Sequence, residues 1–107
     1  MNRKLLARVL NAIETFPELY DPRWYREEHH DGRVTFDLSG LVALVEGATW
    51  CTDDLDDGFV YDEKGEPVGV EAWAAKRLGL SGDASLVLRT CDDRTALPYF
   101  RALLLTT

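Results

Sequence analysis

The chain has 107 residues, 46% of them hydrophobic, and its 19 acidic and 12 basic side chains give a formal charge of −7 at pH 7. This length predicts a single globular domain over residues 1–107, and the apolar content is too high for a disordered chain. The negative charge argues against direct binding to nucleic acid, which requires Lys and Arg to displace the counterions of the phosphates.

Membrane insertion and export are not expected. No run reaches the roughly 18 consecutive apolar residues that a membrane span requires. The basic opening residues are followed by recurring polar side chains, so a continuous apolar export signal is missing. The two cysteines, Cys51 and Cys91, form no CxxC pair, which favours buried, reduced thiols. We therefore expect a cytoplasmic protein.

The first predicted element is a helix over residues 3–16, because its apolar residues recur at helical spacing. The opposite side carries charged and polar residues, as on a helix at a protein surface. Asn2 is the expected N-cap, and Pro17 should end the helix because proline cannot continue one.

A long connection, residues 17–35, follows this helix. In it, Asp21–Pro22 is typical of a cap and a first helical residue, which predicts a single helical turn over 23–25. Trp24 is expected to lie over the core, since exposing so much aromatic surface is unfavourable. Residues 33–36 alternate briefly, which is compatible with a short extended segment.

The most apolar stretch of the chain predicts a central helix over about 37–48. We expect Asp37 or Ser39 to cap it and Gly47 to end it. Its apolar residues leave no polar face, which is typical of a helix in the middle of a bundle. Gly40 begins a stripe of small residues that would allow another backbone to approach closely.

An acidic excursion, residues 53–66, comes next and carries seven acidic residues and one basic residue. Within it, two short apolar runs flank a turn with Gly65 in the left-handed position, which predicts a hairpin over about 59–68. The spacing of the acids does not fit a calcium-binding EF-hand. We expect this excursion to bind a partner through Asp53, Asp54, Asp56, Asp57, Phe59 and Tyr61.

Three more helices are predicted in the C-terminal third. The first covers 71–78 and should end in a Schellman motif at Gly79. Ser81 should cap a helix over 82–91, although the run 85–89 alone also fits a strand. Thr95 should cap the last helix, with a proline in its first turn. The residues expected to face inward from the helix over 82–91 are Ala84, Val87, Leu88 and Cys91.

These elements together predict a mainly α fold. We expect a compact bundle of four or five helices around the buried central helix (about 37–48), with one small β-hairpin (about 59–68).

The order of the parts resembles a family of small, mainly helical, uncharacterised proteins of actinobacteria and their phages. The corresponding stretches are VLNAIETFPELYDPRWY, DLSGLVALVEGA, EAWAAKRLGLSGD and LVLRTCDDRTALPYFRALL. Members of this family often carry cysteine near the start of the central helix, where this chain has Thr35, Asp37 and Ser39. The resemblance implies the helical fold, is consistent with a phage or mobile-element origin, and brings no activity with it.

Two histidines, His29 and His30, are the most suggestive side chains for metal chemistry, because they follow Glu27 and Glu28. Adjacent residues of an extended loop point to opposite sides, however, so a polar surface loop is the preferred interpretation. Adding the two cysteines gives the ligand count of a zinc site but none of its known spacings. We therefore predict no metal ion or other cofactor.

We expect a non-catalytic protein-interaction module that presents its acidic surface to a protein partner. Neither nucleic acid nor a membrane is an expected target. One alternative is an inhibitor that places carboxylates where the phosphates of a nucleic acid would lie on a basic partner. The other is a metal or small-ligand binder, or an enzyme, that uses His29, His30, Glu46 or Cys51. No nucleophile stands beside a base in a known motif, which favours a protein without enzymatic activity.

Overall fold

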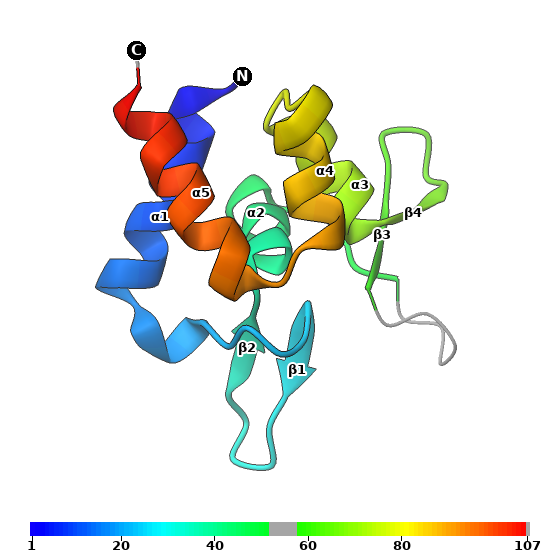
Figure 1. The fold of residues 1–107 in the computed structure, drawn as a ribbon. Helices are drawn as coiled ribbons and strands as arrows, with labels where there is room; N and C mark the ends of the chain where they lie inside the picture. Colours follow the sequence, from blue (N-terminus) through cyan, green and yellow to red (C-terminus); the bar gives the residue numbers. More distant parts are fainter. Residues whose placement is uncertain (52–57, 107) are drawn as a thin grey trace.

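A computed structural model of the protein describes residues 1–51 and 58–106, and helices dominate this part of the chain (Figure 1). The prediction of a compact, mainly helical fold is confirmed. The helices are α1 (Arg3–Thr15), α2 (Leu38–Glu46), α3 (Val70–Arg77), α4 (Gly82–Thr90) and α5 (Asp93–Leu105), and a short 3-10 turn, η1, covers Pro17–Leu19.

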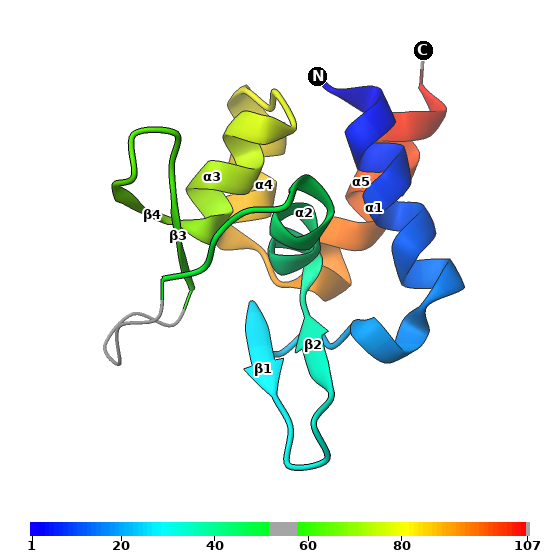
Figure 2. The same cartoon turned by 180° about the vertical axis from the view of Figure 1, so that it is seen from behind.

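The helices form two pairs with α2 between them. In both views α1 lies beside α5, with the two termini at the same end of the molecule, and α3 lies beside α4 (Figures 1 and 2). Helix α2 packs against both α1 and α3. None of the helices in the described part of the chain has the length and apolar character needed to cross a membrane.

Helix α1 follows its sequence pattern closely. The Asn2 side chain accepts a hydrogen bond from the Leu5 N–H at 3.1 Å, and Pro17 begins the next element. These features confirm the predicted cap and end of the helix. The buried face of α1 consists of Leu5, Leu6, Val9, Leu10 and Ile13.

Helix α2 is buried along its first six residues, from Leu38 to Ala43. Asp37 is its cap, and Gly47 ends it in the left-handed conformation at a φ of +71°. The expectation that α2 is apolar and covered on every side is wrong for its last turn. Leu44 there is 42% exposed, and Val45 and Glu46 are only half-buried.

Two antiparallel hairpins project from the helices (Figure 1). The predicted one pairs β3 (Phe59–Tyr61) with β4 (Pro67–Gly69), and its turn has Gly65 at a φ of +78°. The other pairs β1 (Arg26–Glu28) with β2 (Val34–Phe36) and was foreseen only as a brief extended segment. Its strands are three residues long, and β1 is wholly polar, so they carry little hydrophobic periodicity.

The loop before β1 differs from the prediction. The chain makes a non-helical turn at Pro22 and Arg23 and reaches β1 without the expected helical turn. Trp24 is 58% exposed, so the prediction that it covers the core is wrong. Tyr20 and Tyr25 pack against the core instead, because the turn directs the chain so that these two rings point inward.

The C-terminal helices agree with the predicted order but not with every cap. The Leu80 N–H bonds to the Ala75 carbonyl at 2.9 Å, which confirms the Schellman ending of α3. Residues 85–89 are helical rather than a strand. Helix α5 is capped by Asp92, not by Thr95, and therefore starts early enough that Pro98 lies beyond its first turn.

The inward face of α4 is narrower than expected. Leu88 is buried, whereas Ala84, Val87 and Cys91 are half-buried. Helix α4 packs against α3 and α5 and lies on the outer side of the α3–α4 pair, in front of α3 in Figure 1, so only part of its surface is covered.

Candidate functional site

Two carboxylates meet at the N-terminus of α2. Asp37 caps the helix by accepting a hydrogen bond from the Gly40 N–H at 2.8 Å. Asp93, the first residue of α5, accepts one from the Leu38 N–H at 3.0 Å. The first N–H groups of a helix have no partners within it and carry a partial positive charge, so both carboxylates are favourably placed.

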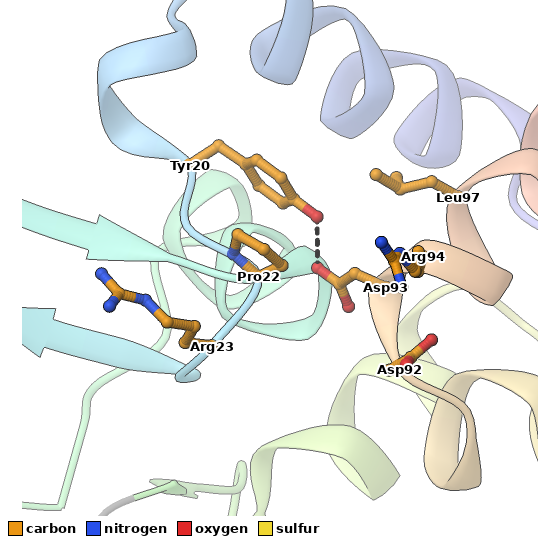
Figure 3. Close-up of a pocket in the computed structure, with 7 residues that line it drawn as sticks. All are labelled: Tyr20, Pro22, Arg23, Asp92, Asp93, Arg94 and Leu97. Carbon is orange, nitrogen blue, oxygen red and sulfur yellow. Dashed lines mark hydrogen bonds between the residues drawn. The ribbon is translucent and has the colours of Figure 1, made fainter.

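Asp93 also binds Tyr20, which belongs to the loop after η1. The Tyr20 hydroxyl donates to the same Asp93 oxygen at 2.6 Å, and Figure 3 shows the two side chains pointing toward each other. One carboxylate therefore joins three segments that lie far apart in the sequence: the loop after η1, the start of α2 and the start of α5.

The neighbouring aromatic residue, Tyr25, makes a second set of contacts. Its hydroxyl donates a 2.5 Å hydrogen bond to Glu71 of α3. Its backbone carbonyl lies so close to α2 that a Cβ added at Gly40 would stand 1.9 Å from the oxygen. The expected close approach of another backbone to the small residues of α2 is thus confirmed at Gly40. The Tyr25 ring also lies against the backbone of Gly58.

Burial dominates the electrostatics of this region. Asp37 is only 9% exposed, and the loss of water raises the pKa of its carboxyl to about 7, although the bond from Gly40 opposes the change. Burial likewise raises the pKa of Asp93. The hydrogen bond to Glu71 raises the pKa of the Tyr25 hydroxyl to about 12. The pKa of Asp37 therefore lies close to neutral pH.

These residues line two adjoining pockets, which share four lining residues. The larger has a volume of about 420 Å³ and is lined by Pro22, Arg23, Trp24, Tyr25, Asp37, Ser39, Glu71, Leu88, Arg89, Thr90, Cys91, Asp92 and Asp93. The smaller has a volume of about 360 Å³ and is lined by Tyr20, Pro22, Arg23, Asp92, Asp93, Arg94 and Leu97 (Figure 3). We call the larger one the acidic pocket, because its lining has four carboxylates and two guanidinium groups.

The positive charges of the acidic pocket are only partly available to oppose its carboxylates. Arg23 already holds Asp21 in an ion pair, with 2.6 Å between nitrogen and oxygen. Its guanidinium group keeps the pKa of Asp21 low, at about 2. Arg89, on the exposed side of α4, is the other guanidinium group of the lining.

Two of the six predicted partner-binding residues, Phe59 and Tyr61, lie in the described part of the chain. Asp53, Asp54, Asp56 and Asp57 are outside the described residues. Phe59, on β3, is 37% exposed, and Tyr61 on the same strand is half-buried. The two residues alternate with buried Val60, as side chains of a half-buried strand do.

The histidines, the cysteines and Glu46, which were considered for metal or catalytic chemistry, do not form one site in the described residues. His29 is half-buried and His30 is exposed, as expected for adjacent residues that point to opposite sides. Cys51 and Cys91 are free and only half-buried, so they are less covered than predicted. Within residues 1–51 and 58–106 they do not join the histidines in a metal-ligand cluster. Glu46 lies 3.9 Å from Arg77, which favours its structural role.

Sequence reasoning identified Asp37 only as a cap and did not identify Asp93 at all. A signal for Asp93 was available. Asp92 and Asp93 stand together before the last helix, and a helix needs only one capping side chain, so the second carboxylate is free to bind elsewhere.

Comparisons of the chain with protein-family models, with curated proteins and with solved structures found no match. The family resemblance described above therefore stays a prediction, and the function of the site is inferred from its own geometry.

Proposed function

We propose that this protein is a non-catalytic interaction module that binds a basic segment of a partner protein at the acidic pocket. The observation that carries the proposal is the composition of that pocket. Asp37, Glu71, Asp92 and Asp93 all line a space of about 420 Å³, which is large enough for a long side chain.

The pocket offers a lysine or arginine two kinds of favourable contact. Carboxylates accept charge-assisted hydrogen bonds, and these are stronger where water is partly excluded. Trp24 and Tyr25 line the same pocket, and Trp24 is largely exposed. A cation placed over the face of such a ring is attracted to it by about 0.5–1 kcal/mol at an exposed site. A basic side chain would therefore gain from both the rings and the carboxylates.

The acidic excursion is connected to this pocket through the chain itself. Asp57 directly precedes Gly58, and Gly58 lies against the ring of Tyr25, which lines the pocket. We propose that Asp53, Asp54, Asp56 and Asp57 attract the basic partner, and that Phe59 and Tyr61 add aromatic contact beside them. Charges near a binding site act chiefly on the rate of association.

Several broader expectations belong to the same proposal. We infer that the bundle is organised around α2, whose N-terminus holds Asp37 and Asp93 beside the pocket. We also propose a cytoplasmic location and a phage or mobile-element origin, in keeping with the family resemblance. Neither catalysis nor a bound cofactor is needed for this function.

A peptide titration tests the proposal. A decalysine peptide is added at low salt to the isotope-labelled protein, and amide and indole resonances are followed by NMR. We expect the indole of Trp24 and the amides around Asp37 and Asp92 to shift together, and decaglutamate to cause no shift. Raising the salt past ~0.15 M should weaken the response, because the screening length falls to about 8 Å.

Two matched variants separate a defined site from general attraction to a negative protein. Glu71→Gln removes a charge of the pocket but keeps an oxygen that can accept the bond from Tyr25. Glu18→Gln removes one exposed charge in η1, which does not line the pocket. Glu71→Gln should weaken peptide binding several-fold and Glu18→Gln should not. Equal effects of the two changes would count against the pocket as the site.

A further inference from the structure

A separate group of polar side chains lies beside the β1–β2 hairpin. Asp21, Glu27 and His29 each offer one potential ligand atom, and these atoms all lie within 4.8 Å of one another. The three side chains are half-buried. They do not line the acidic pocket described above.

The backbone explains why these three residues meet. Glu27 lies on β1, and His29 continues the same ladder, since its N–H bonds to the Arg33 carbonyl at 2.8 Å. Residues two apart on an extended strand face the same side, which places Glu27 and His29 together. Asp21 reaches them from the other edge of β2, where its N–H bonds to the Phe36 carbonyl at 3.0 Å.

Strand β2 thus lies between the segments that supply the ligand atoms, with Thr35 in the middle. Thr35 is buried and is the cross-strand partner of Glu27. Its hydroxyl oxygen is 2.8 Å from His29 Nε2, so it holds the imidazole ring in place. The arrangement is built on backbone pairing and does not depend on the chance meeting of flexible surface side chains.

One atom of this group lacks a partner. Glu27 Oε2 is buried and accepts no hydrogen bond, and it is the one buried side-chain nitrogen or oxygen in residues 1–51 and 58–106 of which this is true. His29 Nε2 lies 3.5 Å from it, beyond the length of a normal hydrogen bond. A buried carboxylate oxygen without a partner is costly, so native structures rarely keep one unless an ion or water satisfies it.

We propose that Asp21, Glu27 and His29 bind one divalent transition-metal ion, with water completing its coordination. A mixed set of one imidazole and two carboxylates suits zinc and its neighbours, whereas calcium and magnesium prefer oxygen ligands alone. Zinc binds these atoms at about 2.0–2.2 Å, which separates two ligands of a tetrahedron by about 3.4 Å. The 3.5 Å between Glu27 Oε2 and His29 Nε2 agrees with that spacing.

Two groups must yield when the metal binds. The Thr35 hydroxyl has to turn away from His29 Nε2, because its oxygen, 2.8 Å from that nitrogen, lies where the metal would bind. The Arg23 side chain, which is 71% exposed, has to release the Asp21 carboxylate. Arg23 therefore competes with the metal for Asp21, both as a hydrogen-bond donor and as a positive charge. This competition predicts that removal of Arg23 tightens metal binding.

Calorimetric titration with zinc tests the proposal. The metal-free protein should bind one zinc ion per chain. Both His29→Ala and Glu27→Gln should raise the dissociation constant at least about tenfold, since even the loss of an outer partner of a metal ligand commonly has that effect. The adjacent exposed residues are the matched controls, so His30→Ala and Glu28→Gln should bind zinc as the unaltered protein does. Arg23→Gln should bind it several-fold more tightly.

Several results would overturn the proposal. The first is that the unaltered protein binds no stoichiometric zinc. The second is that His30→Ala weakens zinc binding as much as His29→Ala does. The third is that Glu27→Gln leaves zinc binding unchanged. Circular dichroism of each metal-free variant checks the fold. If His29→Ala does not fold, Glu27→Gln decides the question, because it preserves the size of the side chain. The peptide titration contains no metal, so the two proposals fail independently.

Discussion

Replacing Asp93 by Ala should destabilise the protein by about 2 kcal/mol. This carboxylate is the only described acceptor for the Leu38 N–H and the Tyr20 hydroxyl, and the change removes both hydrogen bonds. Because these bonds join the loop after η1, α2 and α5, the perturbation tests how the helices are held together around the candidate site.

The magnitude follows from what each donor can do after the change. The Leu38 N–H is at the buried N-terminus of α2, so it stays without a partner at a cost of about 1–3 kcal/mol. Tyr20 is half-buried and its hydroxyl can turn to water, so the loss of its hydrogen bond costs less free energy. Burial raises the pKa of Asp93, which means that keeping it ionised at neutral pH costs some stability that Ala recovers.

The comparison with Asp93→Asn sharpens the test. Both donors bind the same Asp93 oxygen, Oδ2, and an asparagine carbonyl oxygen in that place can accept both bonds. The charge disappears while the hydrogen bonds remain, so this variant should lose less than about 0.5 kcal/mol. Asp83→Ala, an exposed carboxylate in the first turn of α4, is the control and should lie within about 0.5 kcal/mol of the unaltered protein.

Urea unfolding at pH 7, followed by circular dichroism, measures all three free energies. We expect the midpoint of Asp93→Ala to fall without a change in slope. Two results would refute the reasoning: a free energy of unfolding for Asp93→Ala within about 0.5 kcal/mol of the unaltered protein, or an equal loss for Asp93→Asn. The first would show that water replaces the carboxylate at no cost, and the second would show that the charge matters rather than the acceptor.

The folded pKa of Asp37, about 7, lies above its ordinary 3.8, so Asp37 lowers stability progressively as the pH rises through that interval. Asp37→Asn keeps a capping oxygen and should flatten the pH profile of urea unfolding there, by up to about 4 kcal/mol; an unchanged profile would contradict this. Gly40→Ala should lower the melting temperature by several degrees, because its methyl group would strike the Tyr25 carbonyl; retention of the melting temperature would count against that contact. Leu88→Ala should cost about 2–5 kcal/mol in urea and Leu86→Ala, on the exposed side of α4, almost nothing; similar losses would mean that the inward face of α4 is misassigned.

The elements that could be predicted from the sequence are those fixed by local signals. Helix α1 has an N-cap, an apolar stripe and a proline directly after it, and all three act within the helix or next to it. The β3–β4 hairpin depends on Gly65, because its turn needs a positive φ that other residues rarely adopt. The end of α3 was also predictable, because its Schellman motif is a hydrogen-bond pattern between residues only five apart. Neighbouring residues alone decide such features.

The candidate site could not be predicted in this way, because it is made by contacts across the chain. Asp93 lies 55 residues from Leu38 and 73 from Tyr20, and nothing near it in the sequence indicates either partner. The sequence also shows three aromatic residues before β1 without indicating which of them are buried. That choice depends on where the chain crosses Gly40, which is a tertiary contact.

The metal-ligand cluster is an intermediate case. Treating residues 26–36 as a hairpin would have placed Glu27 and His29 on one face, by the same alternation that separates His29 from His30. The third ligand, Asp21, required the three-dimensional structure, because it joins β2 from the side opposite β1. Strands of three mostly polar residues carry too little hydrophobic pattern to reveal that arrangement in advance.

The most direct test of the proposed function is the association rate with a partner isolated by pull-down from the native host. The rate is measured at low salt for the unaltered protein and for a variant with Asp53, Asp54, Asp56 and Asp57 all changed to Asn. We predict the same circular dichroism spectrum for both proteins and an association rate at least about tenfold lower for the variant, with the difference shrinking as salt is added. Equal rates and equal affinities at low salt would contradict the proposal that an acidic surface draws a basic partner to this protein.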